Sequence, residues 1–159
     1  HALLASLYGS RLASRGALAM PQTIWGEMDG AAWVEHAPKF SLVQESIGDP
    51  VLPNIGTEIV AGVVGARQLG TVLQPIAGVS AAGAPVAGSA ITQYRVPATF
   101  SDFQIHGFIT CRNAASAAAQ AQVLAFLRSA WDGAPHVELP AGCSGGSCDF
   151  STRVRRCDE

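Results

Sequence analysis

The chain has few charged residues. Of its 159 residues, 14% are Asp, Glu, Lys or Arg, and the formal net charge is −2; an average soluble domain has roughly 25% charged residues. Nucleic-acid binding needs a dense basic face that neutralises phosphates. The nearest approach is Arg153, Arg155 and Arg156, which stand beside Asp158 and Glu159. We therefore expect no nucleic-acid partner, and these arginines fit a solvated surface.

Long apolar runs and aromatic side chains are also scarce. Hydrophobic residues make up 48% of the chain but aromatic residues only 7%, and there is no run of about 18 apolar residues, which a membrane-spanning helix needs. We expect a thin, Ala-rich core that depends on disulfides or neighbouring subunits for stability. Because the chain begins at His1 rather than Met, we expect a signal peptide or a membrane anchor upstream of it.

Motifs for metal and cofactor binding are missing. His1, His36, His106 and His136 are scattered, with no His-Glu-x-x-His or His-x-His pair. The glycines within 62–70 form neither a dinucleotide fingerprint nor a phosphate-binding loop, since no Gly-Lys-Ser/Thr follows. We therefore expect no cofactor and no metal site, and we expect the histidines to be solvated or to cap helices.

The chain does contain four cysteines, all in its last third. Their even number favours disulfides, and hence a periplasmic or extracellular location, for Cys111, Cys143, Cys148 and Cys157. Three pairings are possible, and the sequence does not choose among them. We favour Cys143 with Cys148, across a Ser-Gly-Gly-Ser loop, and Cys111 with Cys157. The alternative is a four-cysteine zinc site, but the paired close-spaced cysteines that it requires are absent.

Helical patterns dominate the first part of the chain. Residues 2–20 and 23–35 predict two helices, or one long helix with a kink between them. A third helix is expected at 57–69. The clearest helix is expected between a cap at Asn113 and a stop at Gly133, with Val123, Leu124, Leu127, Ala130 and Trp131 as its apolar stripe.

Strand patterns appear later in the chain. We expect strands near 72–79 and 89–96, joined by a flexible Gly- and Ala-rich tip at 81–88. Alternating apolar and polar residues predict two more strands, at 103–111 and 150–156. The last two are expected to lie side by side, since each ends at a cysteine.

This order of helices and strands predicts an α+β fold. We expect an N-terminal helical arm at 1–38 and a small head domain at 39–159. In the head, a small antiparallel sheet would pack on the C-terminal helix, with disulfides stabilising the whole.

The segment Gly-Cys-Ser-Gly-Gly at 142–146 resembles the box around the nucleophile of chymotrypsin-like serine proteases. The chain also has His36, Asp102 and Ser144 in the order of that family's triad. The family implies two β-barrels, which a chain of 159 residues with several helices cannot build. A cysteine also precedes Ser144. A secreted serine hydrolase that uses Ser144 is therefore our third hypothesis.

The N-terminal third carries a second resemblance. A helix with Leu and aromatic residues, followed by Ile-Trp-Gly-Glu-Met-Asp-Gly-Ala-Ala-Trp-Val-Glu-His at 24–36, resembles TadE/TadG-type proteins of tight-adherence pilus systems. The resemblance covers about the first 40 residues. It implies a membrane-embedded helix, which here would lie upstream of His1, continuing into a helical stalk and a small extracellular α+β head. It also implies action by assembly, with no catalytic residue.

We therefore predict a non-enzymatic structural subunit of an extracellular filament or cell-envelope assembly, similar to a pilin. Its partners would be other protein subunits, of the same or a different kind. The contact residues would be apolar side chains of the arm, together with Phe108 on the wetter face of its strand: Leu4, Leu7, Tyr8, Leu12, Trp25, Trp33 and Phe108. The alternative is a virion or secreted binding module that recognises a partner through residues 71–97.

Overall fold

The computed structural model describes residue 36 and residues 40–158. Contacts divide the chain into two units, His1–His36 and Ala37–Glu159, and we call residues 40–158 the head. The helices expected at 2–20 and 23–35 lie outside the described residues. So do six of the expected contact residues: Leu4, Leu7, Tyr8, Leu12, Trp25 and Trp33.

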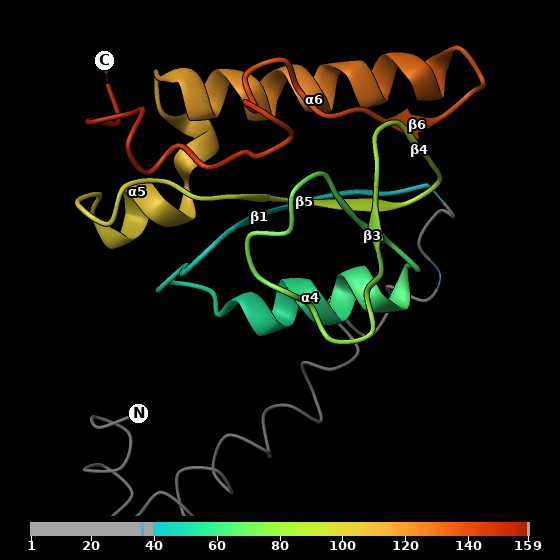
Figure 1. Cartoon of the computed structure of the whole chain (residues 1–159), viewed down its shortest axis with the longest axis horizontal. Helices are drawn as coiled ribbons and strands as arrows, with labels where there is room; N and C mark the ends of the chain where they lie inside the picture. Colours follow the sequence, from blue (N-terminus) through green and yellow to red (C-terminus); the bar gives the residue numbers. More distant parts are fainter. Residues whose placement is uncertain (1–35, 37–39, 159) are drawn as a thin grey trace, which may run out of the picture. The chain divides into compact units, whose positions relative to one another are not determined.

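The head is built on a four-stranded parallel sheet (Figure 1). Its strands, in spatial order, are β1 (Leu42–Ser46), β5 (Ala90–Tyr94), β2 (Arg67–Leu69) and β3 (Ala81–Ala82). Ala90 of the central β5 pairs with Leu42 on one side and with Arg67 on the other. The fold is therefore α/β, and the expected antiparallel main sheet was wrong. The parallel arrangement follows from the helix between β1 and β2, because parallel strands need a crossover connection.

The only antiparallel pair of strands within the described head is small. It joins β4 (Val86–Ala87) to β6 (His136–Val137). The expected flexible tip at 81–88 thus contains two short strands, β3 and β4, and the expected strand at 72–79 is a region of turns and bends. The strand expected at 89–96 is confirmed as β5.

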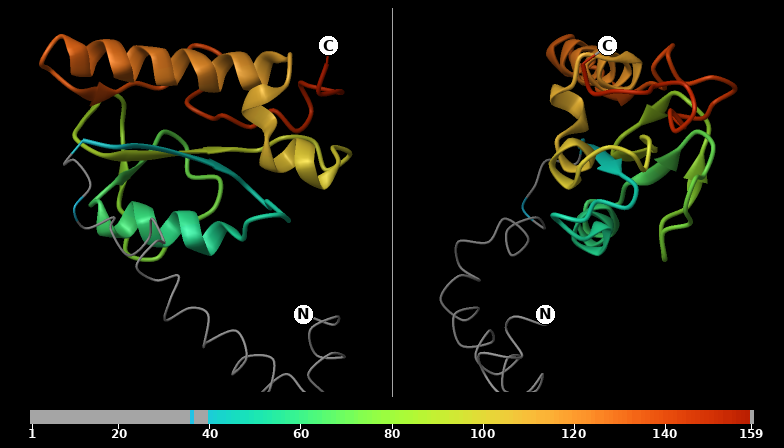
Figure 2. Two further views of the ribbon diagram at one scale, coloured as in Figure 1. Left: turned by 180° about the vertical axis from the view of Figure 1, so that it is seen from behind. Right: turned by 90° about the vertical axis from the view of Figure 1, so that its left-hand side faces the viewer.

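Two helices cover opposite faces of the sheet (Figures 1 and 2). Helix α4 (Asn54–Val63) lies on one face and α6 (Ala114–Trp131) on the other. The predicted position of α6 is confirmed, and so is its cap: the Asn113 side chain accepts hydrogen bonds from the backbone N–H groups of Ala115 and Ser116. Helix α4 ends before the predicted 57–69 segment does, since Arg67–Leu69 forms β2.

The segment 103–111 is not a strand. It forms helix α5 (Asp102–His106) and the 3-10 helix η2 (Phe108–Thr110). The reason is a capping box: the Ser101 hydroxyl accepts from the Gln104 N–H, and the Gln104 side chain accepts from the Ser101 N–H. These local bonds satisfy the first turn and outweigh the alternating pattern.

The segment 150–156 is not a strand either. Strand-like pairing is limited to isolated bridges just outside its two ends, between Arg95 and Asp149 and between Arg112 and Asp158. The Asp149 carboxylate accepts hydrogen bonds from the backbone N–H and the hydroxyl of Ser151, which turns the chain away from the sheet. The two segments do meet at their cysteine ends, where the Arg112 N–H donates to the Cys157 carbonyl at 2.7 Å.

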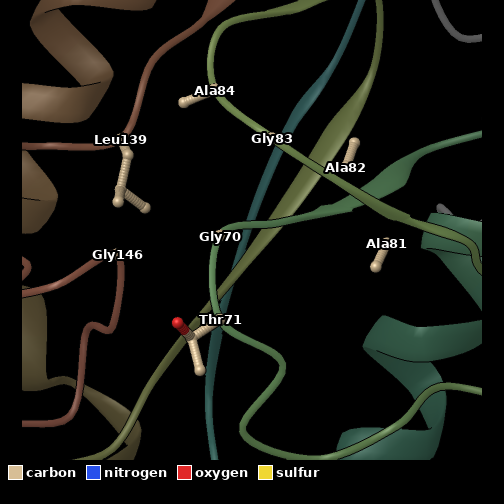
Figure 3. Close-up of a pocket in the computed structure, with 8 residues that line it drawn as sticks. All are labelled: Gly70, Thr71, Ala81, Ala82, Gly83, Ala84, Leu139 and Gly146. Carbon is tan, nitrogen blue, oxygen red and sulfur yellow. The ribbon is translucent and has the colours of Figure 1, made fainter.

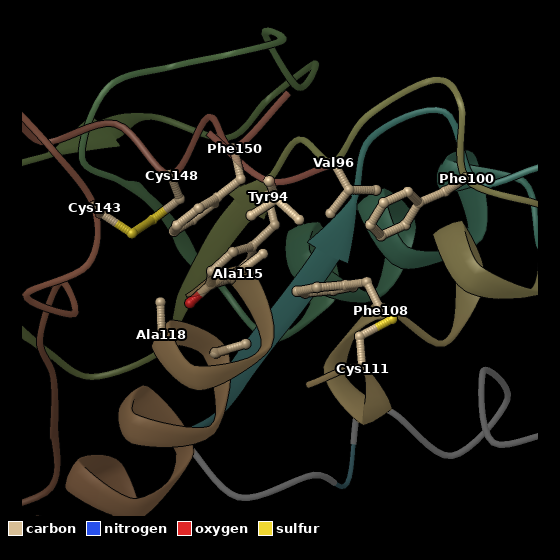
Figure 4. Close-up of a cluster of buried hydrophobic side chains, with 12 residues drawn as sticks. Tyr94, Val96, Phe100, Phe108, Cys111, Ala115, Ala118, Cys143, Cys148 and Phe150 are labelled. Carbon is tan, nitrogen blue, oxygen red and sulfur yellow. A yellow bond between two sulfur atoms is a disulfide. The ribbon is translucent and has the colours of Figure 1, made fainter. Parts of the chain in front are cut away.

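The largest apolar cluster lies between the sheet and α6 (Figure 4). The rings of Tyr94 and Phe108 have centroids 5.1 Å apart, and Phe150 stacks on the other side of Tyr94. Ala115, Ala118 and Ala119 of α6 pack against them. The helix therefore contributes alanines to this core, as the Ala-rich composition predicted. None of the helices described is both long and apolar enough to span a bilayer.

Candidate interaction surfaces

Two disulfides close the C-terminal part of the head. Cys111 is bonded to Cys157 and Cys143 to Cys148, which is the pairing that the sequence favoured. Among the described residues, no cysteine is free, and no group of three or more His, Cys, Asp or Glu side chains is placed to hold a metal ion. The disulfides indicate an oxidising compartment outside the cytoplasm.

Phe108 cannot serve as the contact residue that the strand pattern suggested. It belongs to η2, and only 4% of its surface is exposed because it packs against Tyr94 in the core. The error came from reading a strand with two faces where the chain makes a turn of helix. Phe108 stabilises the fold and is unavailable to a partner.

The loop that resembles a protease nucleophile box is built around an arginine. Arg153 donates to the Ser144 hydroxyl at 2.8 Å and to the Gly142 carbonyl at 2.9 Å, and its guanidinium lies 4.1 Å from the Phe150 ring centroid. A guanidinium remains protonated and cannot take the serine proton as a general base. Asp102 lies in the exposed first turn of α5, and His36 belongs to the other unit. The triad therefore has no geometric support.

Helix α4 presents an apolar stripe to the solvent. Ala61 on its inner side is fully buried, whereas three large side chains on the outer side, and Leu52 just before the helix, are exposed by 51–61%. The three within α4 lie four residues apart and so share one face of the helix. We call Leu52, Ile55, Ile59 and Val63 the α4 stripe.

Helix α6 presents a second stripe. Leu124, Leu127 and Trp131 are exposed by 54%, 56% and 92%, and we call them the α6 stripe. The sequence predicted these residues as the buried side of the helix, and this was wrong. The buried side is instead the Ala-rich face with Gln122, since the core beneath it already holds the large rings of Tyr94 and Phe150.

These two stripes are unusual for a monomer. Single exposed leucines are common, but contiguous apolar patches on soluble proteins mark sites of interaction. Trp131 is 92% exposed, and tryptophan is among the residue types enriched at the hot spots of protein interfaces. The stripes lie on opposite sides of the molecule, because α4 and α6 cover opposite faces of the sheet (Figure 2).

A pocket of about 460 Å³ lies at the carboxyl ends of β2 and β3 (Figure 3). Such edges are the usual ligand sites of parallel sheets. Its lining is Gly70, Thr71, Ala81, Ala82, Gly83, Ala84, Leu139 and Gly146. Thr71 supplies the only polar side chain in this lining, so the pocket lacks acid–base groups. Gly70 is required here: its φ is +79°, and a Cβ would lie 2.5 Å from the Gly146 carbonyl oxygen.

A polar chain crosses the buried face of the sheet beneath α4. Gln93 donates to Glu45 Oε2 at 2.9 Å, and Gln68 donates to Gln93 at 2.6 Å. Glu45 is 2% exposed, and its Oε1 accepts no hydrogen bond from any described residue. Burial raises the pKa of Glu45 above its ordinary value, although the bond from Gln93 opposes this. The sequence analysis missed this group, although polar residues within a strand were visible in Leu-Val-Gln-Glu-Ser.

Two partly exposed contacts, a hydrogen bond and an ion pair, fasten loops within the head. Asp49, after β1, bonds His106 of α5 at 2.7 Å, and Arg95 bonds Asp149 at 3.1 Å. Burial tends to raise the pKa of Asp49, but the bonds from His106 and from backbone N–H groups lower it overall. His106 thus joins α5 to the β1–α4 loop, in place of the strand position that the sequence predicted.

Comparison of the chain with protein families, with characterised proteins and with solved structures finds no match. Any function assigned to the stripes or the pocket therefore rests on the geometry of the head alone.

Proposed function

We propose that this protein is a structural subunit of an extracellular filament or cell-envelope assembly and that it acts by contact rather than by catalysis. The observation that carries the proposal is the pair of apolar stripes on opposite faces of one disulfide-closed head. A subunit with two separate contact surfaces can bind two neighbours at once, as every internal subunit of a filament must.

The size of the stripes supports many weak contacts rather than one strong contact. Burying the exposed half of a large aliphatic side chain contributes roughly 1 kcal/mol. Association costs an estimated 4–15 kcal/mol in lost freedom. One stripe alone therefore gives a weak complex, and repetition along an assembly, or a second contact elsewhere in the chain, would strengthen it.

The N-terminal resemblance supports the same proposal in finer detail. The Ile-Trp-Gly-Glu-Met-Asp-Gly-Ala-Ala-Trp-Val-Glu-His motif at 24–36 resembles TadE/TadG-type pilus proteins. We propose that residues 1–38 form a helical arm that contacts neighbouring subunits through Trp25 and Trp33, and that a segment upstream of His1 anchors the protein to the membrane before assembly.

The test is light scattering on the full chain across a concentration series. We expect the wild-type protein to form larger species as its concentration rises. Trp131→Ser and Ile59→Asp should each lower the association affinity at least several-fold. Phe103→Ser is the matched control. Phe103 is 78% exposed but belongs to neither stripe, so its loss should leave the assembly unchanged.

A wild-type protein that remains monomeric at every concentration would contradict self-assembly. It would favour the alternative, a secreted binding module, for which the pocket lined by Thr71, Gly83 and Ala84 is a candidate site.

A further inference from the structure

We propose that the α6 stripe of one copy binds the α4 stripe of a second copy, so that the contact is head-to-tail. This inference rests on the proposed function and names its partner: the same chain, through a different surface. The alternatives are contacts of each stripe with itself, in a closed pair, or with some other occupant.

The two stripes have matching lengths. From Ile55 to Val63, and from Leu124 to Trp131, a helix rises by roughly 12 Å and roughly 10 Å. Each stripe is one narrow row of side chains on the solvent side of a helix, opposite the residues that the helix buries. Two helices of this kind can pack with the rows interlocked.

The charges beside the stripes favour unlike pairing. Glu58 is the only charged residue of α4 and Arg128 the only one of α6. Glu58 lies three residues from Ile55, and Arg128 four from Leu124, so each charge borders its own stripe. Neither forms a salt bridge within the described head. Pairing a stripe with itself would bring like charges together, whereas pairing α4 with α6 would bring Glu58 near Arg128.

The shapes also differ in a complementary way. The α6 stripe ends in Trp131, which projects into solvent. Beside the α4 stripe, Gly56 and Gly62 leave space, since a Cβ at either position would meet no atom within 4 Å. An indole ring from a second copy can therefore approach the α4 backbone next to Ile59.

This pairing does not close on itself. Because the stripes lie on opposite faces of the sheet (Figures 1 and 2), a copy bound through α6 still offers its α4 stripe to a third copy. Head-to-tail contacts of this kind build open chains unless a rotation closes them into a ring. The two stripes together are thus a repeating connector.

The test mixes two full-length variants, each lacking one surface. Ile59→Asp removes the α4 stripe and Leu127→Asp removes the α6 stripe; both sites are exposed, so the fold should persist. A 1:1 mixture restores one intact contact, because the first variant keeps a wild-type α6 stripe and the second keeps a wild-type α4 stripe. We expect mixing to produce dimers beyond those of either variant alone, measured by light scattering and by energy transfer between labelled variants.

The matched control mixes Ile59→Asp with Val63→Asp, which both lack the α4 stripe and should gain nothing on mixing. Charge reversal gives a second readout: Glu58→Arg should weaken wild-type assembly by up to about five-fold, and adding Arg128→Glu in the same chain should restore it.

Two results would overturn the inference alone. In the first, the wild type assembles but mixing produces no gain, which assigns the stripes to another occupant, such as residues 1–39 or a different protein. In the second, Leu127→Asp assembles as well as wild type, which points to a symmetric α4 contact. A wild type that never assembles would refute both this inference and the proposed function.

Discussion

Glu45 places a carboxyl group in the interior with one oxygen unpartnered among the described residues. Its folded-state pKa is raised, mainly by burial, from the ordinary value of 4.5. At low pH the carboxyl is protonated in both the folded and the unfolded chain, so no buried charge destabilises the folded state. As the pH rises through the raised pKa, the folded protein must ionise a buried group, and stability is lost.

We therefore expect Glu45→Gln to stabilise the protein at pH 7 by about 1 kcal/mol, because the amide removes the buried charge and still accepts from Gln93. The gain should disappear near pH 4. Urea unfolding at both pH values measures it, with Asp132→Asn as the control, because Asp132 is exposed and belongs to none of the ion pairs of the described head. If Glu45→Gln were less stable at neutral pH, the ionised carboxylate would be needed as a hydrogen-bond acceptor.

At the scale of the element, α6 is fixed at its start by a single side chain. Asn113 caps the helix through its Oδ1, and its Nδ2 donates to the carbonyls of Arg156 and Cys157. The residue thus holds the helix to the C-terminal tail as well as capping its first turn. The sequence predicted the cap but not the second role.

These two roles can be separated by substitution. Asn113→Ala should lose both and cost about 2 kcal/mol in the free energy of unfolding. Asn113→Asp keeps the cap acceptor and loses the donors to the tail, so we expect roughly half that loss. Chemical denaturation with circular dichroism measures both. Equal losses in the two variants would show that the tail contacts carry all of the effect.

At the scale of the whole molecule, the disulfides restrict the unfolded chain to different degrees. Cys111 and Cys157 are separated by 46 positions, whereas Cys143 and Cys148 are separated by 5. In the entropy model, the longer loop contributes about 4 kcal/mol and the shorter about 2 kcal/mol.

Replacing each pair by alanines should therefore lower the free energy of unfolding by about 4 kcal/mol for 111/157 and about 2 kcal/mol for 143/148, as measured in urea. Thiol titration of the unfolded, unreduced wild type should detect no free thiol. Four free thiols would remove the basis for placing the protein outside the cytoplasm. Equal losses from the two pairs would mean that packing around the sulfurs matters more than loop length.

The elements that sequence predicted well are those controlled by local chemistry. Asn113 and Gly133 bracket α6 because caps act within one helical turn, and β5 follows from its β-branched run. The α4 and α6 stripes were not predicted as surfaces. Helix α6 has apolar residues on both faces, Ala on one and Leu with Trp on the other, so its periodicity could not show which face is buried.

The sequence by itself determined which cysteines can form disulfides, the low charge, the Ala-rich core and the position of the longest helix described. Each of these depends on composition or on neighbours along the chain. The tertiary structure alone decided that the sheet is parallel, that Phe108 is buried and that both stripes face solvent. Those outcomes depend on which distant segments meet. With strands of two to five residues, burial between distant segments outweighs local preference.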